Sequence, residues 1–172
     1  MISKENTIGL LRHTRHDWLN RIQIIKGNLE LGKPDRALEI IGQIIEESIN
    51  ETQLSNLNLP LFSEFLLTYN WNNQPLIIKF EVKGTPKQVV VDDEYLYKKT
   101  NEIVELLLST LDMSEENVLM ITIDLEEETR FYYDFRGKLK DIDLVSKYFN
   151  ECVEPSFQNV YFDEEELSIQ LL

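Results

Sequence analysis

A short polar segment near the N-terminus holds both histidines of the 172-residue chain. The segment reads Arg12-His13-Thr14-Arg15-His16-Asp17-Trp18-Leu19-Asn20. If the segment is helical, residues three and four apart share a face, so His13, His16 and Asn20 line up. Asp17 adjoins His16 on the same side. Packing alone does not select imidazole, carboxylate, amide and guanidinium groups together in the middle of a helix, so this face is the candidate site.

These residue types suit phosphoryl transfer. Imidazole has an unperturbed pKa of about 6.5, so most of it is neutral and nucleophilic near neutral pH. Phosphohistidine and aspartyl phosphate both keep a high transfer potential, so the protein has mainly to position the nucleophile and offset phosphoryl charge. The segment therefore predicts His16 as a transient phosphoryl carrier and Asp17 as the group that orients its ring. Arg12 or Arg15 would contact the phosphate oxygens.

Each of these residues also has an ordinary structural interpretation. A histidine on a helix is usually a surface or capping residue, and Asp17 is equally well a solvated helix charge. Arg15 breaks an apolar seam and could pair across a helix bundle instead of binding phosphate. His13 lacks an adjoining carboxylate, so we expect it to tune the site without carrying phosphate.

Two helices must position this segment. Over residues 6–31 apolar side chains recur at alternating spacings of three and four, which is typical of a helix with an apolar seam. The seam consists of Ile8, Leu11, Trp18, Ile22, Ile25 and Leu29, with Arg15 among them. Gly32 predicts the end of this helix, and Pro34 suits the first turn of a second helix over 35–57. Because only Gly32–Lys33 separates the helices, they form an antiparallel hairpin.

The apolar faces of the hairpin are too wide for two helices to bury. Dimerisation into a four-helix bundle is the simplest remedy, so the sequence predicts a homodimer. The alternative is that the C-terminal domain covers the apolar face within one chain.

The rest of the chain predicts an α+β domain, an α/β sandwich with one sheet and a helical layer. After a linker at 58–60, the residue patterns predict a mixture of helices and strands. Helices are expected at 62–71, 92–112 and 141–152, and strands at 76–82, 89–91, 118–125, 130–135 and 167–171. The predicted domains are therefore 1–57, for dimerisation and phosphotransfer, and 58–172.

Composition excludes several classes of function. The net charge is −14, and residues 58–172 hold 23 acidic against 10 basic side chains, which disfavours binding to nucleic acid. No apolar run is long enough to cross a bilayer, and no signal-peptide pattern is present, so we expect no membrane contact and a cytoplasmic location. The lone Cys152 rules out an internal disulfide and a thiolate metal cluster, and no metal site is expected on this chain.

Longer motifs around the histidines resemble a known family. The run RHDWLNRIQIIKGNLELGKPDRALEII, followed by LSNL and FLLTYNW, is similar to the sporulation initiation phosphotransferase B family of bacilli. The resemblance implies a helical hairpin that dimerises into a four-helix bundle, followed by a domain shaped like the ATP-binding domain of histidine kinases. It also implies that the chain takes phosphate from a single-domain response regulator and gives it to the regulator that switches on sporulation genes.

The same resemblance assigns residues and a cofactor. The phosphorylated histidine maps onto His16, and the surface that meets the regulators maps onto the same helix, including His13, Asn20 and Gln23. This chain would need no cofactor of its own, because Mg²⁺ would come with an acidic pocket of the partner regulator.

A kinase-like domain suggests ATP binding, but the sequence argues against it. ATP-binding domains of that class need glycine-rich lid segments, so that backbone can approach the nucleotide. Beyond residue 84 this chain has a single glycine, Gly137, and Asn101-Glu102-Ile103 matches the magnesium-binding asparagine box poorly. We therefore expect a degenerate ATP site. The alternative functions are an autophosphorylating histidine kinase core and a non-catalytic dimerisation scaffold.

Overall fold

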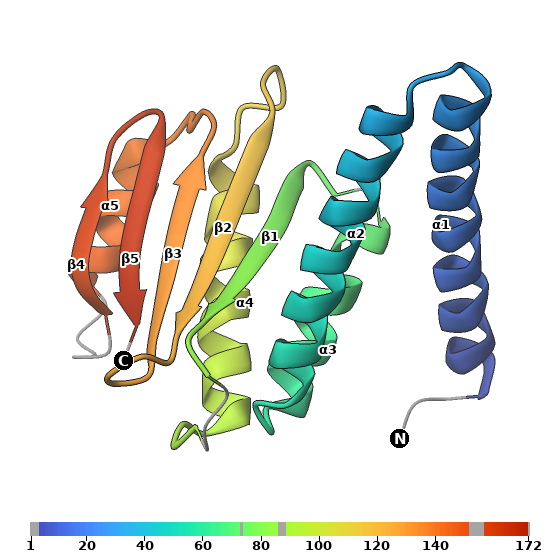
Figure 1. Ribbon diagram of the computed structural model, residues 1–172. Coiled ribbons are helices and arrows are strands. Elements are labelled where there is room, and N and C mark those ends of the chain that lie inside the picture. Colours follow the sequence, from blue (N-terminus) through green and yellow to red (C-terminus); the bar gives the residue numbers. More distant parts are fainter. Residues whose placement is uncertain (1–3, 73, 86–88, 152–156, 172) are drawn as a thin grey trace. The chain divides into compact units, whose positions relative to one another are not determined.

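The structure is a computed structural model that describes residues 4–72, 74–85, 89–151 and 157–171 (Figure 1). Side chains at 4–7, 10, 13 and 72 lie outside the description. The chain divides into two compact units, Met1–Ile49 and Asn50–Leu172.

The first unit is the predicted helical hairpin. Its helices are α1 (Lys4–Glu30) and α2 (Pro34–Ser55), and α2 continues into the second unit. Gly32 has a φ of 70°, and the Lys33 N–H donates to the Asn28 carbonyl at 2.9 Å while the Gly32 N–H donates to the Leu29 carbonyl at 3.0 Å. These two bonds end α1 with a left-handed glycine cap. Both predicted helices and the stop at Gly32 are confirmed.

The seams predicted along the hairpin stay largely exposed within it. Arg21 and Glu47 join the two helices by an ion pair of 2.6 Å, and Ala37 is buried. Large apolar side chains that remain exposed on the two helices include Ile8, Leu11, Trp18, Ile22, Leu29, Leu38, Ile41, Ile45 and Ile49. The hairpin by itself therefore does not bury the apolar surface that its sequence provides.

The second unit is built on a five-stranded sheet in the order β1-β2-β3-β5-β4. The strands are β1 (Leu76–Lys83), β2 (Asn117–Asp124), β3 (Arg130–Arg136), β4 (Phe157–Phe162) and β5 (Glu166–Leu171). β1 and β2 are parallel, which requires the crossover helix α4 (Asp93–Thr110), and the other pairs are antiparallel. The remaining helices are α3 (Pro60–Thr68), the 3₁₀ turn η1 (Tyr69–Asn72) and α5 (Ile142–Glu151).

Helices cover one face of this sheet, as Figure 1 shows for α4 and α5. Alternate residues of β2, among them Leu119, Ile121 and Ile123, point into the core and are fully buried. The end of α2 belongs to the same unit, because Leu54 is fully buried and the Asn50 side-chain oxygen accepts the Val82 N–H at 3.0 Å. The predicted α+β class is confirmed.

The edge of β1 is occupied by asparagine side chains. Asn70 uses both ends of its amide, donating to the Ile78 carbonyl at 2.6 Å and accepting the Ile78 N–H at 3.0 Å. Together with Asn50 at Val82, this gives the edge backbone partners that a further strand would otherwise supply.

Two expectations about strands fail. The strand predicted at 89–91 is wrong: Val89 and Val91 pack against the core and Val90 is 92% exposed, but these residues are irregular and pair with no strand among the described residues. They lead instead into the cap of α4, where the Asp92 side chain accepts the Tyr95 N–H at 2.7 Å. The strand β4 is absent from the prediction, and a register shift between Gln158 and Tyr161 interrupts the alternation that would have revealed it.

None of the described helices combines the length and apolarity that crossing a bilayer requires.

Candidate phosphotransfer site

His16 lies in the middle of α1 with its ring largely in solvent, since 72% of the side chain is exposed. Two neighbouring side chains lie close to the same ring nitrogen. The Asn20 Nδ2 atom is 3.2 Å from Nδ1, and the Asp17 Oδ1 atom is 3.5 Å from it. Among the described residues, Nε2 has no hydrogen-bond or ion-pair partner. The ring is therefore held at Nδ1 and open at Nε2.

Helical spacing explains this arrangement. Asn20 is four residues after His16, one turn further along the same face, so its short amide reaches back to the ring. Asp17 is adjacent in sequence and 47% exposed, so water screens its carboxylate considerably. The sequence predicts Asn20 only as a contact for a partner. The four-residue spacing was the signal that could have indicated its contact with the ring.

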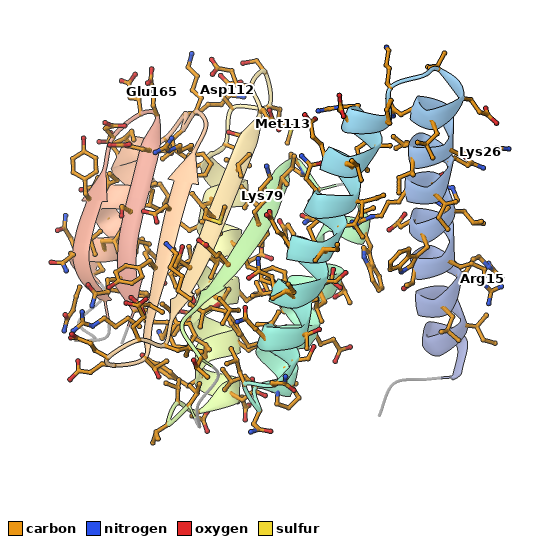
Figure 2. The ribbon with its side chains drawn as sticks, in the orientation of Figure 1. Arg15, Lys26, Lys79, Asp112, Met113 and Glu165 are labelled. Atoms are coloured by element: carbon orange, nitrogen blue, oxygen red, sulfur yellow. The ribbon has the colours of Figure 1, made fainter. Side chains whose placement is uncertain are left out.

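The two arginines proposed as phosphate contacts are both exposed on α1. Neither Arg12 nor Arg15 pairs with a carboxylate in the part of the chain that the structure describes, and Figure 2 shows Arg15 directed outward from its helix. Both guanidinium groups are thus available to an anion from another molecule. The alternative for Arg15, pairing across a bundle, remains a prediction.

The remaining predicted site residues are less informative. The side chain of His13 lies outside the described residues. Gln23 is exposed on α1, two turns after His16. Their roles in partner binding stay predictions.

The second unit has a groove near the segment that the histidine-kinase resemblance would assign to an ATP site. This groove of about 520 Å³ lies between α4 and α5 and includes the Asn101–Glu102 segment. Glu102 is already engaged, because it pairs with Lys99 at 3.0 Å and accepts the Tyr148 hydroxyl at 3.2 Å. The groove is also lined by Glu105 and Glu151. Lys147, the lysine in this lining, already pairs with Glu151 at 4.0 Å, so the described lining offers carboxylates but no unpaired cation to the phosphates of a nucleotide.

Gly137 serves a structural purpose. The Asn117 side chain packs over it, accepting the Lys138 N–H at 3.1 Å and donating to the Asp112 carbonyl at 2.8 Å. A Cβ at position 137 would overlap the Asn117 oxygen and lie 2.8 Å from Phe135 Cζ. This close approach explains why a glycine stands here without invoking a nucleotide.

No cluster of three or more His, Cys, Asp and Glu side chains is placed to hold a metal ion within the described residues. Cys152 lies outside them.

Comparison with known proteins decides the family. Residues 2–57 match the family description "Sensor kinase SpoOB-type, alpha-helical domain", and residues 58–172 match "Sporulation initiation phospho-transferase B, C-terminal". Sporulation initiation phosphotransferase B of Bacillus subtilis (strain 168) is 35% identical over 137 residues, which cover 78% of this chain and 71% of the relative. The chain belongs to the sporulation initiation phosphotransferase B family. This membership supports a phosphotransferase role in sporulation signalling.

Two solved structures of a histidine kinase are weaker matches. The nucleotide-free catalytic domain of histidine kinase ThkA has a TM-score of 0.43 at 11% identity, covering 65% of this chain and 90% of that one. Histidine kinase ThkA in complex with response regulator protein TrrA has a TM-score of 0.38 at 14% identity, covering 95% of this chain and 60% of that one.

Proposed function

We propose that this member of the sporulation initiation phosphotransferase B family is a phosphorelay enzyme that carries a phosphoryl group on Nε2 of His16. The observation that supports this most is the asymmetry of the ring. Nδ1 is engaged by side chains of its own helix, and Nε2 faces solvent, where the acyl phosphate of another protein can approach in line.

The proposed chemistry is two successive displacements at phosphorus. In the neutral ring that carries its proton on Nδ1, the Nε2 lone pair attacks the aspartyl phosphate of a response regulator. The P–N bond forms as the bond from phosphorus to the acyl oxygen breaks, and the aspartate leaves as a carboxylate. The positive charge that develops on the ring is stabilised by Asp17 next to Nδ1. An aspartate of the second regulator then attacks, and the P–N electron pair returns to Nε2.

The surroundings of the ring suit this transfer. Arg12 and Arg15 can offset charge on the moving phosphoryl group, and Asp17 can restrain the ring. We assign the Mg²⁺ ion to the acidic pocket of the regulator.

The proposed partners are those that the family implies: a single-domain response regulator as donor and the sporulation transcription regulator as acceptor. His13, Asn20 and Gln23 are the residues we propose for contact with them. Residues 58–172 carry 13 more acidic than basic side chains, so nucleic acid is not among the proposed partners.

We also propose that the active form is a homodimer in which the hairpins pair as a four-helix bundle. The apolar side chains left exposed on both helices support this, since Trp18, Leu29 and Ile45 are each about half exposed in one hairpin. Burying such side chains between two hairpins would stabilise the pair by about 25 cal/mol per Å² of apolar area.

The decisive experiment mixes a phosphorylated single-domain regulator with the parent protein and with the variant His16→Gln, and follows the phosphoryl group. We expect this variant to fold normally, because the side chain is exposed, and to accept no phosphate. In the parent the label should be acid-labile and stable in base, as expected for phosphohistidine. The matched control is Lys26→Gln, an exposed residue of the same helix, which should still be labelled. A label that persists in His16→Gln would refute the proposal.

The rival functions are separated by two further measurements. Incubation with labelled ATP and Mg²⁺, without any regulator, would label a histidine kinase core but not a phosphotransferase. A dimerisation scaffold would support signalling equally well with His16→Gln.

A further inference from the structure

Two helices of the second unit, α3 and α4, share an apolar patch on the side that faces away from the sheet. The helices begin together, because the Asp93 carboxylate at the start of α4 accepts the N–H groups of Leu61 and Phe62. One turn further along each helix, the rings of Phe65 and Tyr97 meet edge to face with their centroids 5.7 Å apart. Side chains from the two helices therefore form one continuous surface.

The patch consists of Leu61, Phe65 and Tyr97. Leu61 is 44% exposed and Tyr97 is 36% exposed, while Phe65 is partly buried against the core. Single exposed apolar side chains are ordinary on a protein surface, but apolar side chains in contact with one another mark a binding surface. Aromatic side chains suit such a surface, because they offer a large contact area and lose little conformational freedom when they are covered.

Carboxylates border this patch. Glu64 on α3 and both Glu94 and Glu105 on α4 are exposed, and none of the three carboxylates has a hydrogen-bond or ion-pair partner among the described residues. Positions 94, 97 and 105 differ by three and eight residues, so these two glutamates lie on the same side of α4 as Tyr97. Lys98 is the exposed cation beside them. The border is therefore negative, which favours a positively charged partner.

We infer that the patch of Leu61, Phe65 and Tyr97 docks a basic amphipathic helix of a partner protein. An apolar stripe of that helix would cover the patch, and its lysine or arginine side chains would pair with the bordering carboxylates. The negative border repels nucleic acid and anionic lipid surfaces, so neither is the occupant we assign. The inference goes beyond phosphoryl transfer and does not depend on His16.

The test uses the full chain labelled with ¹⁵N and two synthetic peptides made of leucine and lysine. The first peptide, about 14 residues long, places its leucines on one face of a helix of about four turns. The second has the same composition in an order that gives no apolar face. We expect the first peptide to shift amide signals of α3 and α4 saturably. It should bind about tenfold more tightly than the second, because only the first can cover the apolar patch.

Two tyrosine variants locate the apolar contact. Tyr97→Ser should weaken binding of the first peptide about tenfold, as is common for an aromatic residue in an interface. Tyr161→Ser is the matched control, because Tyr161 is 52% exposed on β4, and it should leave the affinity unchanged. Both side chains are exposed, so both variants should stay folded, which circular dichroism would verify.

Two pairs of glutamate variants locate the charge contact. Glu94→Gln combined with Glu105→Gln should weaken binding of the first peptide about fivefold, as expected for losing two exposed ion pairs. Glu116→Gln combined with Glu165→Gln removes the same charge from exposed positions elsewhere in the unit and should have a smaller effect. Salt at about 1 M, which screens charges beyond about 3 Å, should abolish the difference between the two pairs.

Three results would overturn the inference. The two peptides could bind equally well, or the amide shifts could spread over the whole acidic unit, and either result would show that charge alone attracts them. The third result concerns a second copy of this chain as the occupant. In that case Tyr97→Ser would weaken self-association in sedimentation equilibrium, whereas we expect no change.

Discussion

Two buried tyrosine hydroxyls in the α+β unit differ in whether they have a partner. Tyr133 is fully buried, and its hydroxyl lies 2.7 Å from the Thr100 hydroxyl. The Tyr69 hydroxyl is also buried but has no hydrogen-bond partner among the described residues. Burial, with a smaller contribution from the negative charge of Glu105, raises the pKa of Tyr69 to about 12.

Tyr69→Phe should therefore change how stability depends on pH. Because the folded protein holds this proton more tightly than the unfolded chain, the stabilisation is complete below pH 10 and is lost as the pH rises from 10 to about 12. The free energy of unfolding, from urea titrations, should fall less steeply over that range in Tyr69→Phe than in the parent. At pH 8 the variant should be at least as stable, because it removes an unsatisfied buried hydroxyl. Parallel curves above pH 10 would contradict the assignment.

At the scale of single residues, the sequence shows which side chains gather on one helix face, but not which of them touch. The clustering of His16, Asp17 and Asn20 is visible in the sequence, but whether Asn20 reaches the ring or only a partner depends on a side-chain position. Lys99 is a similar case, since a lysine is expected outside and this one is 7% exposed. Its ion pair with Glu102, three residues later on the same helix, makes that burial tolerable. The spacing predicts the pair but not its burial.

Among the elements, α3 depends on another helix for its cap. Leu59 precedes α3 and supplies no side-chain hydrogen bond. Asp93, at the start of α4, accepts the N–H groups of Leu61 at 2.8 Å and Phe62 at 3.1 Å. One carboxylate thus satisfies two free donors of α3 and ties the two helices together.

Asp93→Ala should destabilise the protein by about 1–2 kcal/mol, the usual cost of losing a helix cap. Chemical denaturation followed by circular dichroism would measure the loss. The matched control is Glu94→Ala, which removes an exposed carboxylate in the same turn and should change stability by no more than about 0.5 kcal/mol. Equal losses in the two variants would show that Asp93 acts only through its charge.

The elements themselves were largely predictable where periodicity is strong. The helices of the hairpin, α4 and the β2–β3 hairpin all follow from apolar spacing. β4 does not, because Phe157–Phe162 contains a register shift and Asn159 has a φ of 49°. The parallel pairing of β1 with β2 was not predicted either, because the sequence of a strand does not specify which strand it pairs with across a crossover.

The whole molecule is asymmetric in what it leaves exposed. The hairpin leaves a row of apolar side chains exposed, whereas the α+β unit buries most of its own and carries most of the acidic groups. The prediction of a homodimer depends on that row.

Trp18→Ala should weaken the dimer by about 2 kcal/mol or more per subunit, as is common for a tryptophan at the centre of an interface. Sedimentation equilibrium across a range of concentrations would measure the dissociation constant. Ile24→Ala is the matched control, because Ile24 is 53% exposed but lies about 120° around the helix from Trp18. A parent that is monomeric at micromolar concentration would refute the dimer and favour cover by the α+β unit of the same chain.

The asparagines along β1 have a consequence for how other proteins can recognise this one. A strand from another protein can be added to an exposed sheet edge. The added strand binds through backbone hydrogen bonds, so this kind of binding tolerates many sequences. Here both backbone groups of Ile78 and the N–H of Val82 are already engaged by amides of the same chain. A strand added at this edge would therefore have to displace these amides, so the edge is a poor site for recognition through backbone hydrogen bonds. The same blunted edge also removes one route to aggregation.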